Sequence, residues 1–342
     1  MASGGWCLLA VGVACAVVPP RVCGAGIDHS AQLPVDWPLG PLRVQNMSPV
    51  AQLYGLPLSV SAHILDAGFE SSLSFAAVSN FQIRDTPQTA VYLDGETHIA
   101  RLDLRGALAP GWEWGVTVPY LRHAGGQLDT LIDNFHSLFG LPDGGRAAQP
   151  RHQLRYRLQV DDAVAVDIDH GTGGLGDVRL FAGYQVMQDP RRALAVRAQI
   201  KLPTGQVDRL TGSRAVDVAV ATAYERALWD SRCRCALSAG LGVTYLGAGR
   251  LLPTRQRRWA GTAHVGLQFR LHPRLQLHAQ VDGHTTLLDT GNPLLAEGGL
   301  LGTLGGRIGL SPRWWLDLAV IEDLHHEAAA DVALQLTLGA RL

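Results

Sequence analysis

Apolar and polar residues alternate with a period of two through most of the chain after residue 111. In one such run the apolar positions are Trp112, Trp114, Val116, Val118 and Tyr120. In another, Leu275, Leu277, Ala279 and Val281 alternate with Gln276, His278, Gln280 and Asp282. Successive side chains of a β-strand point to opposite faces, so this alternation predicts strands with one apolar and one polar face.

Twelve segments show the pattern. They are residues 69–81, 97–109, 112–121, 176–187, 193–203, 215–227, 234–246, 259–271, 275–287, 300–310, 314–323 and 331–342. Most exceed the about 5–6 residues of a globular strand and suit the about 9–11 residues of a tilted membrane strand. The first of them and the preceding residues 26–68 alternate poorly.

The connections between these segments are short and long in turn. The short ones are 109–112, 187–193, 227–234, 271–275 and 310–314, whereas the longest spans 121–176. Outer-membrane barrels have short periplasmic turns and longer extracellular loops. The chain is therefore predicted to be all-β, an antiparallel transmembrane barrel of about twelve strands with both ends on the short-turn side. A secreted β-sandwich is the alternative, because it also alternates.

Aromatic residues are found near both ends of the predicted strands. Trp112, Trp114, Trp229, Trp314 and Trp315 lie beside short turns, and Tyr120, Tyr245 and Trp259 lie beside long loops. Two such belts match the interfacial girdles of a membrane barrel.

The N-terminus is typical of an export signal. An apolar run from Trp6 to Val18 precedes Cys23-Gly24-Ala25, so we expect cleavage after Ala25, although no basic residue precedes the run. No later apolar run reaches the about 18 residues that a membrane helix needs. The predicted division is a signal peptide at 1–25, a periplasmic, plug-like or extra-strand segment at 26–68, and a barrel at 69–342.

Composition narrows the function. The 342 residues carry a net charge of −1, with 17% charged residues, which does not suit a nucleic-acid binder. After signal removal two cysteines remain, Cys233 and Cys235, and we interpret them as incidental, with a strained disulfide as the alternative.

The long connection at 121–176 contains one predicted amphipathic helix. Its apolar stripe, at helical spacing, consists of Leu128, Leu131, Ile132, Phe135, Leu138 and Phe139. Gly140 and Pro142 would end the helix. Such a helix either folds into the barrel mouth as a constriction or packs against the outer loops, and the pattern favours neither.

Polar residues on the inward face of the strands are the candidate lumen lining. They are Arg197, Lys201, His264, Arg270, His278 and Asp282. A turn near Pro273 would place His264 opposite Asp282 and Gln268 opposite His278. A His–Asp pair suggests a hydrolase, but no serine shares that face of the two strands, so we interpret the pair as lumen lining. Lys201, the only lysine, is a candidate for charge selectivity, with a solvated rim charge as the simpler interpretation.

Two further clusters carry weak signals. Residues 171–176 contain a formal G-x-G-x-x-G motif without the strand and helix that a dinucleotide site needs, so we interpret them as a turn. The acidic and histidine residues at 322–327 are interpreted as a solvated loop rather than a cation site. We predict no catalytic residue, no metal and no cofactor.

Several motifs carry a family resemblance. They are Asn46-Met47-Ser48-Pro49, Tyr54-Gly55-Leu56-Pro57, Phe139-Gly140-Leu141-Pro142, Gly144-Gly145-Arg146, Gly173-Gly174-Leu175-Gly176-Asp177, Lys201-Leu202-Pro203-Thr204-Gly205 and Thr211-Gly212-Ser213. Together they resemble the DUF3187 family of predicted outer-membrane barrels of proteobacteria, from about residue 40 to the end. The last three also look like transporter-like barrels associated with aromatic degradation. The resemblance implies location and fold but no activity.

The resulting hypothesis is a narrow channel in the outer membrane of a Gram-negative bacterium, for passive uptake of small solutes, hydrophobic ones included. Its expected partners are outer-membrane lipid, lipopolysaccharide and the barrel-assembly machinery. Such barrels usually end in Phe, and Leu342 here predicts weaker recognition by that machinery. A closed structural or surface-interaction barrel is the first alternative, and a membrane lipid hydrolase is the second.

Overall fold

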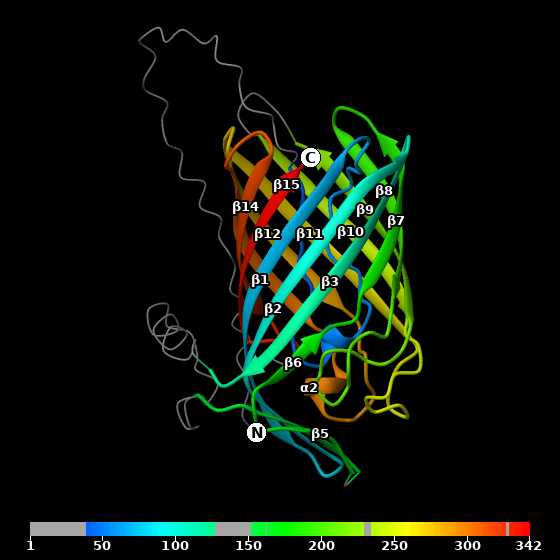
Figure 1. Ribbon diagram of the computed structural model, residues 1–342, viewed down its shortest axis with the longest axis vertical. Helices are drawn as coiled ribbons and strands as arrows, with labels where there is room; N and C mark the ends of the chain where they lie inside the picture. The colour runs from blue at the N-terminus through cyan, green and yellow to red at the C-terminus, as the bar shows by residue number, and fades with distance from the viewer. Residues whose placement is uncertain (1–38, 127–151, 162, 229–233, 326–327) are drawn as a thin grey trace, which may run out of the picture. The chain divides into compact units, whose positions relative to one another are not determined.

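The computed structural model describes residues 39–126, 152–161, 163–228, 234–325 and 328–342. Among them, fifteen strands form one antiparallel sheet, and twelve of these close a barrel (Figure 1). The barrel strands are β1 (Phe69–Asp85), β2 (Thr89–Ala109), β3 (Trp112–Ala124), β7 (Arg179–Gln188), β8 (Arg192–Lys201), β9 (Asp217–Ala227), β10 (Cys235–Tyr245), β11 (Trp259–His272), β12 (Leu275–His284), β13 (Leu300–Gly309), β14 (Trp314–Asp323) and β15 (Val332–Arg341). The predicted twelve-stranded barrel is therefore confirmed.

Closure joins the first and last strands. β1 pairs with β15 from Glu70 opposite Arg341 to Ser79 opposite Val332. The short turns and the end of the chain lie at one end of the barrel, where the main chains of Phe69 and Leu342 exchange two hydrogen bonds. We call this the short-turn end and the opposite end the long-loop end; in Figure 1 they are at the top and bottom.

The polarity of the barrel is the reverse of that of a soluble protein. Leu241 and Leu304 point outward and are 69% and 66% exposed, whereas Gln268 and Gln280 point inward and are buried. An apolar outer surface around a polar interior is what a hydrocarbon environment requires. The Trp112 ring packs at a tilt against Tyr184 at the short-turn end, and Tyr245 makes an edge contact with Trp259 at the long-loop end. The alternation therefore marks a membrane barrel and not a sandwich.

Three short strands extend the sheet at the long-loop end. β4 (Arg155–Val160) pairs with the first part of β2, and β5 (Ala163–Ile168) pairs with β4. β6 (Thr172–Leu175) pairs with β3, so the interpretation of residues 171–176 as a turn is wrong for this stretch. These strands were not predicted because they are only four to six residues long, too short for a clear alternation of apolar and polar residues.

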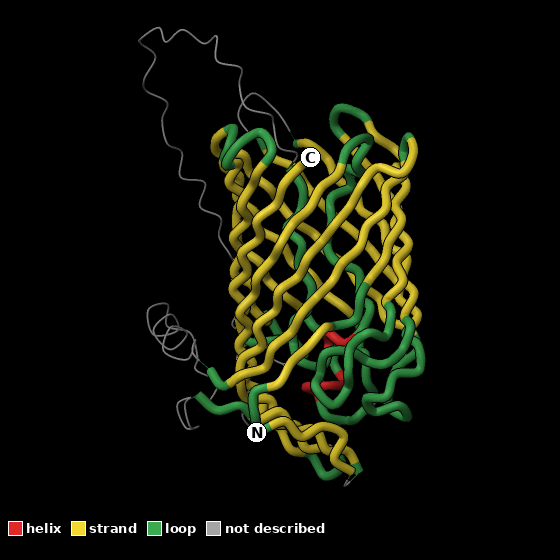
Figure 2. The backbone as a smooth tube through the Cα atoms, in the orientation of Figure 1, coloured by secondary structure: helices red, strands yellow, loops and turns green. Residues whose placement is uncertain are grey.

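Residues 39–68, which we call the inner segment, run through the barrel interior (Figure 2). They descend toward the long-loop end, turn at the 3₁₀ helix η1 (Ala51–Leu53) and return to Gly68 beside the end of β15. Side chains of β2, β7, β9, β12 and β15 all hydrogen-bond to this segment. Residues 39–68 therefore lie inside the barrel.

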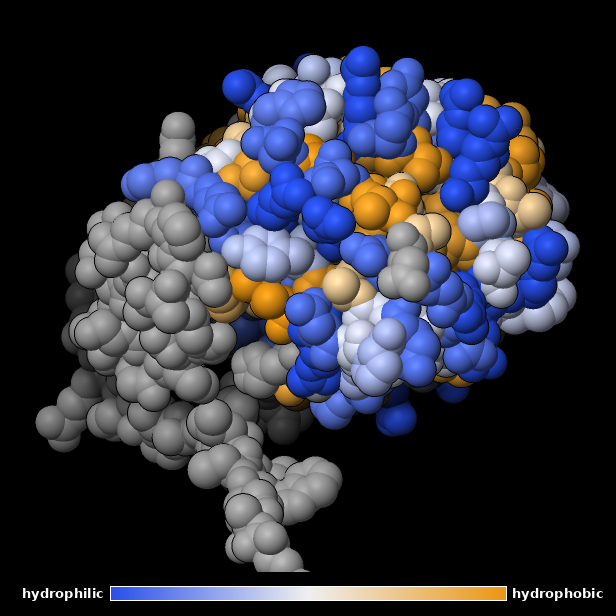
Figure 3. Space-filling view, turned by 90° about the horizontal axis from the view of Figure 1, so that it is seen from below, coloured by the Kyte–Doolittle hydropathy of each residue, from blue (hydrophilic) through white to orange (hydrophobic). Residues whose placement is uncertain are grey.

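The long-loop end is covered by an apolar core. The tip of the inner segment packs there with β4, with the loops around Leu210, Leu251 and Leu288, and with the short helix α2 (Pro293–Ala296). Figure 3 views this end and shows apolar side chains gathered between polar ones. The loops thus form a folded cap rather than an open rim.

Two further sequence predictions concern the cysteine pair and the amphipathic helix. Cys235 is disulfide-bonded, so it is not an incidental cysteine; Cys233 lies outside the described residues. The amphipathic helix predicted at 128–139 also lies outside them. No helix in the described ranges is long and apolar enough to cross a membrane.

Gly339 of β15 provides a test of the barrel packing. A Cβ atom there would lie 2.0 Å from the indole of Trp315 on β14, so Gly339→Ala must displace a buried ring. We expect a loss of about 1–3 kcal/mol in the free energy of unfolding. The measurement is the temperature at which the folded, fast-migrating band disappears from unboiled gels. Gly174→Ala is the control, because nothing lies within 4 Å of its Cβ position; equal transitions for both variants would contradict the prediction.

Candidate functional site

The candidate site is the lumen with the inner segment inside it. Two glutamine side chains bind the two extended parts of this segment, one before and one after η1. Gln280 of β12 accepts a hydrogen bond from the main-chain N–H of Leu42 (3.0 Å) and donates one to its carbonyl (3.2 Å). Gln185 of β7 accepts from the N–H of Ile64 (3.1 Å) and donates to the carbonyl of Ala62 (2.9 Å). An extended segment without a neighbouring strand needs such partners for its peptide groups.

The tip of the inner segment is held by charged side chains. The N–H of Gly55 donates to Asp217 Oδ2 (2.8 Å), and its carbonyl accepts from Gln199 (3.0 Å). Arg179 donates to the carbonyls of Tyr54 and Leu56. A Cβ on residue 55 would lie 2.8 Å from the Cβ of Asp217, so the close approach requires glycine.

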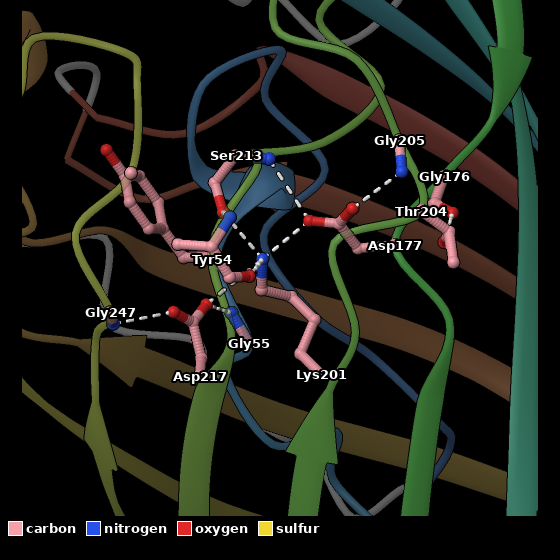
Figure 4. Close-up of polar contacts among 12 residues, drawn as sticks. Tyr54, Gly55, Gly176, Asp177, Lys201, Thr204, Gly205, Ser213, Asp217 and Gly247 are labelled. Atoms are coloured by element: carbon pink, nitrogen blue, oxygen red, sulfur yellow. Dashed lines mark hydrogen bonds and ion pairs between the residues drawn. The ribbon is translucent and has the colours of Figure 1, made fainter.

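Lys201 is the centre of a buried ionic cluster beside this tip (Figure 4). Its ammonium lies 2.5 Å from Asp177 and 3.3 Å from Asp217, and it donates to Ser213 Oγ (2.6 Å). Asp177 also accepts from the N–H groups of Gly205 and Ser213. Lys201 is fully buried and paired, so a solvated rim charge is the wrong description.

The cluster links three loops to the inner segment: the loop before β7, the loop between β8 and β9, and the loop after β10. Asp217 accepts hydrogen bonds from Gly247 and from Gly55, so one carboxylate joins the loop after β10 to the segment tip. The neighbouring Tyr54 side chain is buried, and burial with the nearby Asp217 carboxylate holds the pKa of its phenol well above the usual range. The phenol is therefore uncharged in this apolar cap.

One wall of the lumen is strongly ionic. Arg105 and Arg341 both pair with Glu70, at 2.8 and 3.1 Å. Arg105 and Arg197 share Glu113, at 3.4 and 2.7 Å. On the same wall, Arg43 of the inner segment pairs with Asp103 of β2 (3.4 Å), which attaches the segment to this side of the barrel.

The opposite wall, on β9–β12, is lined by small residues. Ala221, Ala223, Gly240 and Thr262 surround a cavity that His264 and Asp282 also line. His264 lies opposite Asp282, and Gln268 opposite His278, as the turn near Pro273 predicted. Small side chains leave the space that the inner segment occupies.

Ser59 of the inner segment reaches this wall, which sequence analysis of the two strands did not anticipate. Its hydroxyl donates to Asp282 Oδ1. A serine hydrolase needs the serine hydroxyl to face a histidine that a carboxylate orients. Here the serine bonds the carboxylate itself, so this contact is structural.

Four cavities follow the inner segment through the lumen. From the long-loop end to the short-turn end their volumes are about 10, 50, 40 and 400 Å³. His284 lines the first and second, Arg197 the second and third, and Arg43 the third and fourth. The shared linings place them one after another, with the widest open toward the short-turn end.

The six predicted lumen residues all lie on the inward face of their strands. Arg197, His264 and Asp282 line the cavities, while Lys201 belongs to the cluster at the segment tip. His278 is buried on β12, nearer the short-turn end than Asp282, and Arg270 is half-buried near the short-turn end of β11.

Most side chains that bind the main chain of the inner segment were not among the predicted lumen residues. Gln185, Asp217 and Gln280 occupy inward positions on their strands, so parity alone would have found them. Nothing in the alternation could show that residues 39–68 lie against them, because an extended segment held by side chains has no period. In the described ranges no group of three His, Cys, Asp or Glu side chains could hold a metal ion.

A polar interior inside an apolar outer wall defines the fold of an outer-membrane β-barrel. The chain belongs to the family described as "Protein of unknown function (DUF3187)", whose model matches residues 21–342. No curated protein matches the chain in sequence.

The fold is shared with a solved structure. The COG4313 outer membrane channel from Pseudomonas putida F1 superposes with a TM-score of 0.55 at 11% identity, over 82% of this chain and 97% of that chain. The NanC porin (TM-score 0.44, 7% identity, 80% and 100%) and the Ralstonia pickettii toluene transporter TbuX (0.41, 11%, 89% and 96%) are more distant. At these identities the likeness concerns the fold alone.

The Lys201 cluster generates a stability prediction. Lys201→Met leaves Asp177 and Asp217 buried without their cation, and we expect a loss of about 3–5 kcal/mol in the free energy of unfolding. Urea unfolding in detergent micelles, followed by tryptophan fluorescence, measures it. Arg257→Met is the control: its pair with Asp289 is exposed (3.2 Å) and contributes little. A Lys201→Met variant as stable as this control would show that the cluster does not stabilise the fold.

Proposed function

We propose that the protein is a narrow outer-membrane channel for passive uptake of small solutes, and that the inner segment is its gate. The observation that supports this most directly is the series of cavities that follows the inner segment from cap to short-turn end. The apolar outer surface and the aromatic residues at both ends support a place in the outer membrane. Outer-membrane lipid, lipopolysaccharide and the barrel-assembly machinery are the partners that this location implies.

The width of the path explains why the segment must move. A water molecule needs about 10–15 Å³ of such space, so the two middle cavities, of about 50 and 40 Å³, hold only a few waters. A solute of several heavy atoms passes only after the inner segment shifts. The segment joins β1 through the exposed residues 66–68, which offer a hinge at the short-turn end.

The cap favours solutes with apolar groups. Leu53, Leu56 and Leu210 are among the apolar residues that a solute meets on passing from the long loops to the lumen. Farther in, Arg197, His264 and Asp282 line the path and would set its selectivity.

A closed structural barrel is the second candidate, and the density of polar contacts around the inner segment favours it. Ion pairs and hydrogen bonds hold this segment to β2, β7, β8, β9 and β12. The two candidates differ in one property, because only the channel requires the segment to move.

A reversible tether distinguishes them. In Ser59→Cys/Asp282→Cys the new thiols replace a hydrogen-bonded pair between the inner segment and β12. We expect oxidation to reduce conductance and solute uptake to the level of protein-free membranes, and reduction to restore both. Planar-bilayer recording and liposome swelling provide the measurements.

The matched control is Ser74→Cys/Thr337→Cys, whose hydroxyls meet at 2.8 Å between β1 and β15 within the barrel wall. Oxidation of this pair should leave conductance unchanged, and it also accounts for any effect of reductant on the disulfide of Cys235. Equal uptake by the tethered and reduced Ser59→Cys/Asp282→Cys protein would refute gating by the segment. No conductance in any form would favour the closed barrel.

A further inference from the structure

The barrel recognises the inner segment mainly through its peptide groups. Barrel side chains contact the N–H groups of Leu42, Gly55, Ala62, Ile64 and Leu65, and the carbonyls of Leu42, Arg43, Tyr54, Gly55, Leu56 and Ala62. Fewer contacts involve side chains of the segment, such as those of Arg43, Ser59 and His63. Recognition of main-chain atoms depends little on which amino acid supplies them, except at Gly55, where a Cβ atom would lie 2.8 Å from the Cβ of Asp217.

The chemistry of the wall matches a peptide at each contact. A glutamine carboxamide has the same donor and acceptor as a peptide group, so Gln185 and Gln280 bind the segment as a neighbouring strand would. The carboxylates of Asp217 and Glu225, which can only accept, take the N–H groups of Gly55 and Ala62, each at 2.8 Å. Arg179 donates to the main-chain carbonyls of Tyr54 and Leu56 and also to the side-chain oxygen of Gln45 (2.7 Å).

Displacement of the inner segment would remove at least one hydrogen-bond partner from each of these wall groups. Some barrel partners would remain, such as Asp282 for Gln280 and Lys201 for Asp217. Unpaired buried polar groups are costly, and a pure hydrocarbon offers them neither donors nor acceptors. Water or a molecule that carries its own alternating N–H and C=O groups can replace the segment. An extended peptide does so at the same spacing along the lumen.

We propose that the lumen wall is a binding site for extended peptides, and that short peptides with apolar side chains are the solute class of the channel. The inner segment is the resident occupant of this site, and an incoming peptide exchanges with it contact by contact. The solute class rests on the proposed channel function, because the segment must leave the lumen before a solute passes. The binding site itself does not.

The exposed linker at residues 66–68 allows a direct test in the folded full chain. A protease site inserted after Ala67 lets the segment be cut from the barrel after folding, with heat-modifiable migration to show that the barrel stays intact. We expect the cut fragment to remain bound through gel filtration or to be replaced by a labelled synthetic peptide of residues 39–66. Loss of the fragment without uptake of the labelled peptide would overturn the proposal.

Wall variants test which groups bind. Gln185→Leu/Gln280→Leu removes both carboxamides and should speed dissociation of the cut fragment by about a hundredfold, since four hydrogen bonds are lost. Gln268→Leu is the matched control, because Gln268 is also buried in the lumen but bonds Ser238 of the barrel (2.9 Å). Equal dissociation from both variants would contradict recognition through main-chain atoms.

Conductance separates this proposal from the channel function. In cut protein from which the fragment has been removed, the peptide of residues 39–66 should block the ion current, and its analogue N-methylated at residues 42, 55, 62 and 64 should not. A polyethylene glycol of similar mass controls for size. Ion current without peptide-specific block would overturn the solute class and leave the channel intact. Absence of any current would overturn the proposed channel function. The peptide-binding site would then still be tested by whether the cut fragment stays bound or is replaced by the labelled peptide.

Discussion

The structure depends on the need of an extended chain for hydrogen-bond partners inside a barrel. Residues 39–68 have no adjacent strand, so their peptide groups are paired by inward side chains such as Gln280, Gln185 and Asp217. Without that segment, the atoms of these side chains that now bind it would need water as their partner. The inner segment and the barrel wall therefore supply each other's hydrogen-bond partners, and the polar side chains of the lumen surround a stretch of extended main chain.

The outer surface obeys a different constraint. Every strand must present apolar side chains to lipid, which leaves only alternate positions for the lumen. Charged residues at these positions are paired within the barrel, as in the sharing of Glu70 and Glu113 by three arginines. This pairing stiffens one wall, whereas small residues such as Ala223 and Gly240 make room on the other.

These two features bear on how a filled barrel would work as the proposed channel. The inner segment blocks the lumen except for a row of small cavities, and it is attached at an exposed linker. Its tip is the most firmly held part, because Asp217 joins Gly55 to Lys201 and to the loop after β10. Movement of the segment would therefore begin with disruption of the contacts beneath the cap.

The sequence by itself determined the twelve strands, their order and the short-turn end, because lipid and lumen impose a period of two on each strand. It also determined the cross-strand partners His264 and Asp282, because a tight turn sets the register. Only the tertiary structure decided that residues 39–68 fill the lumen, that Lys201 is buried between two carboxylates and that Ser59 meets Asp282. Those contacts join residues far apart in the chain through side-chain hydrogen bonds, which leave no period in the sequence.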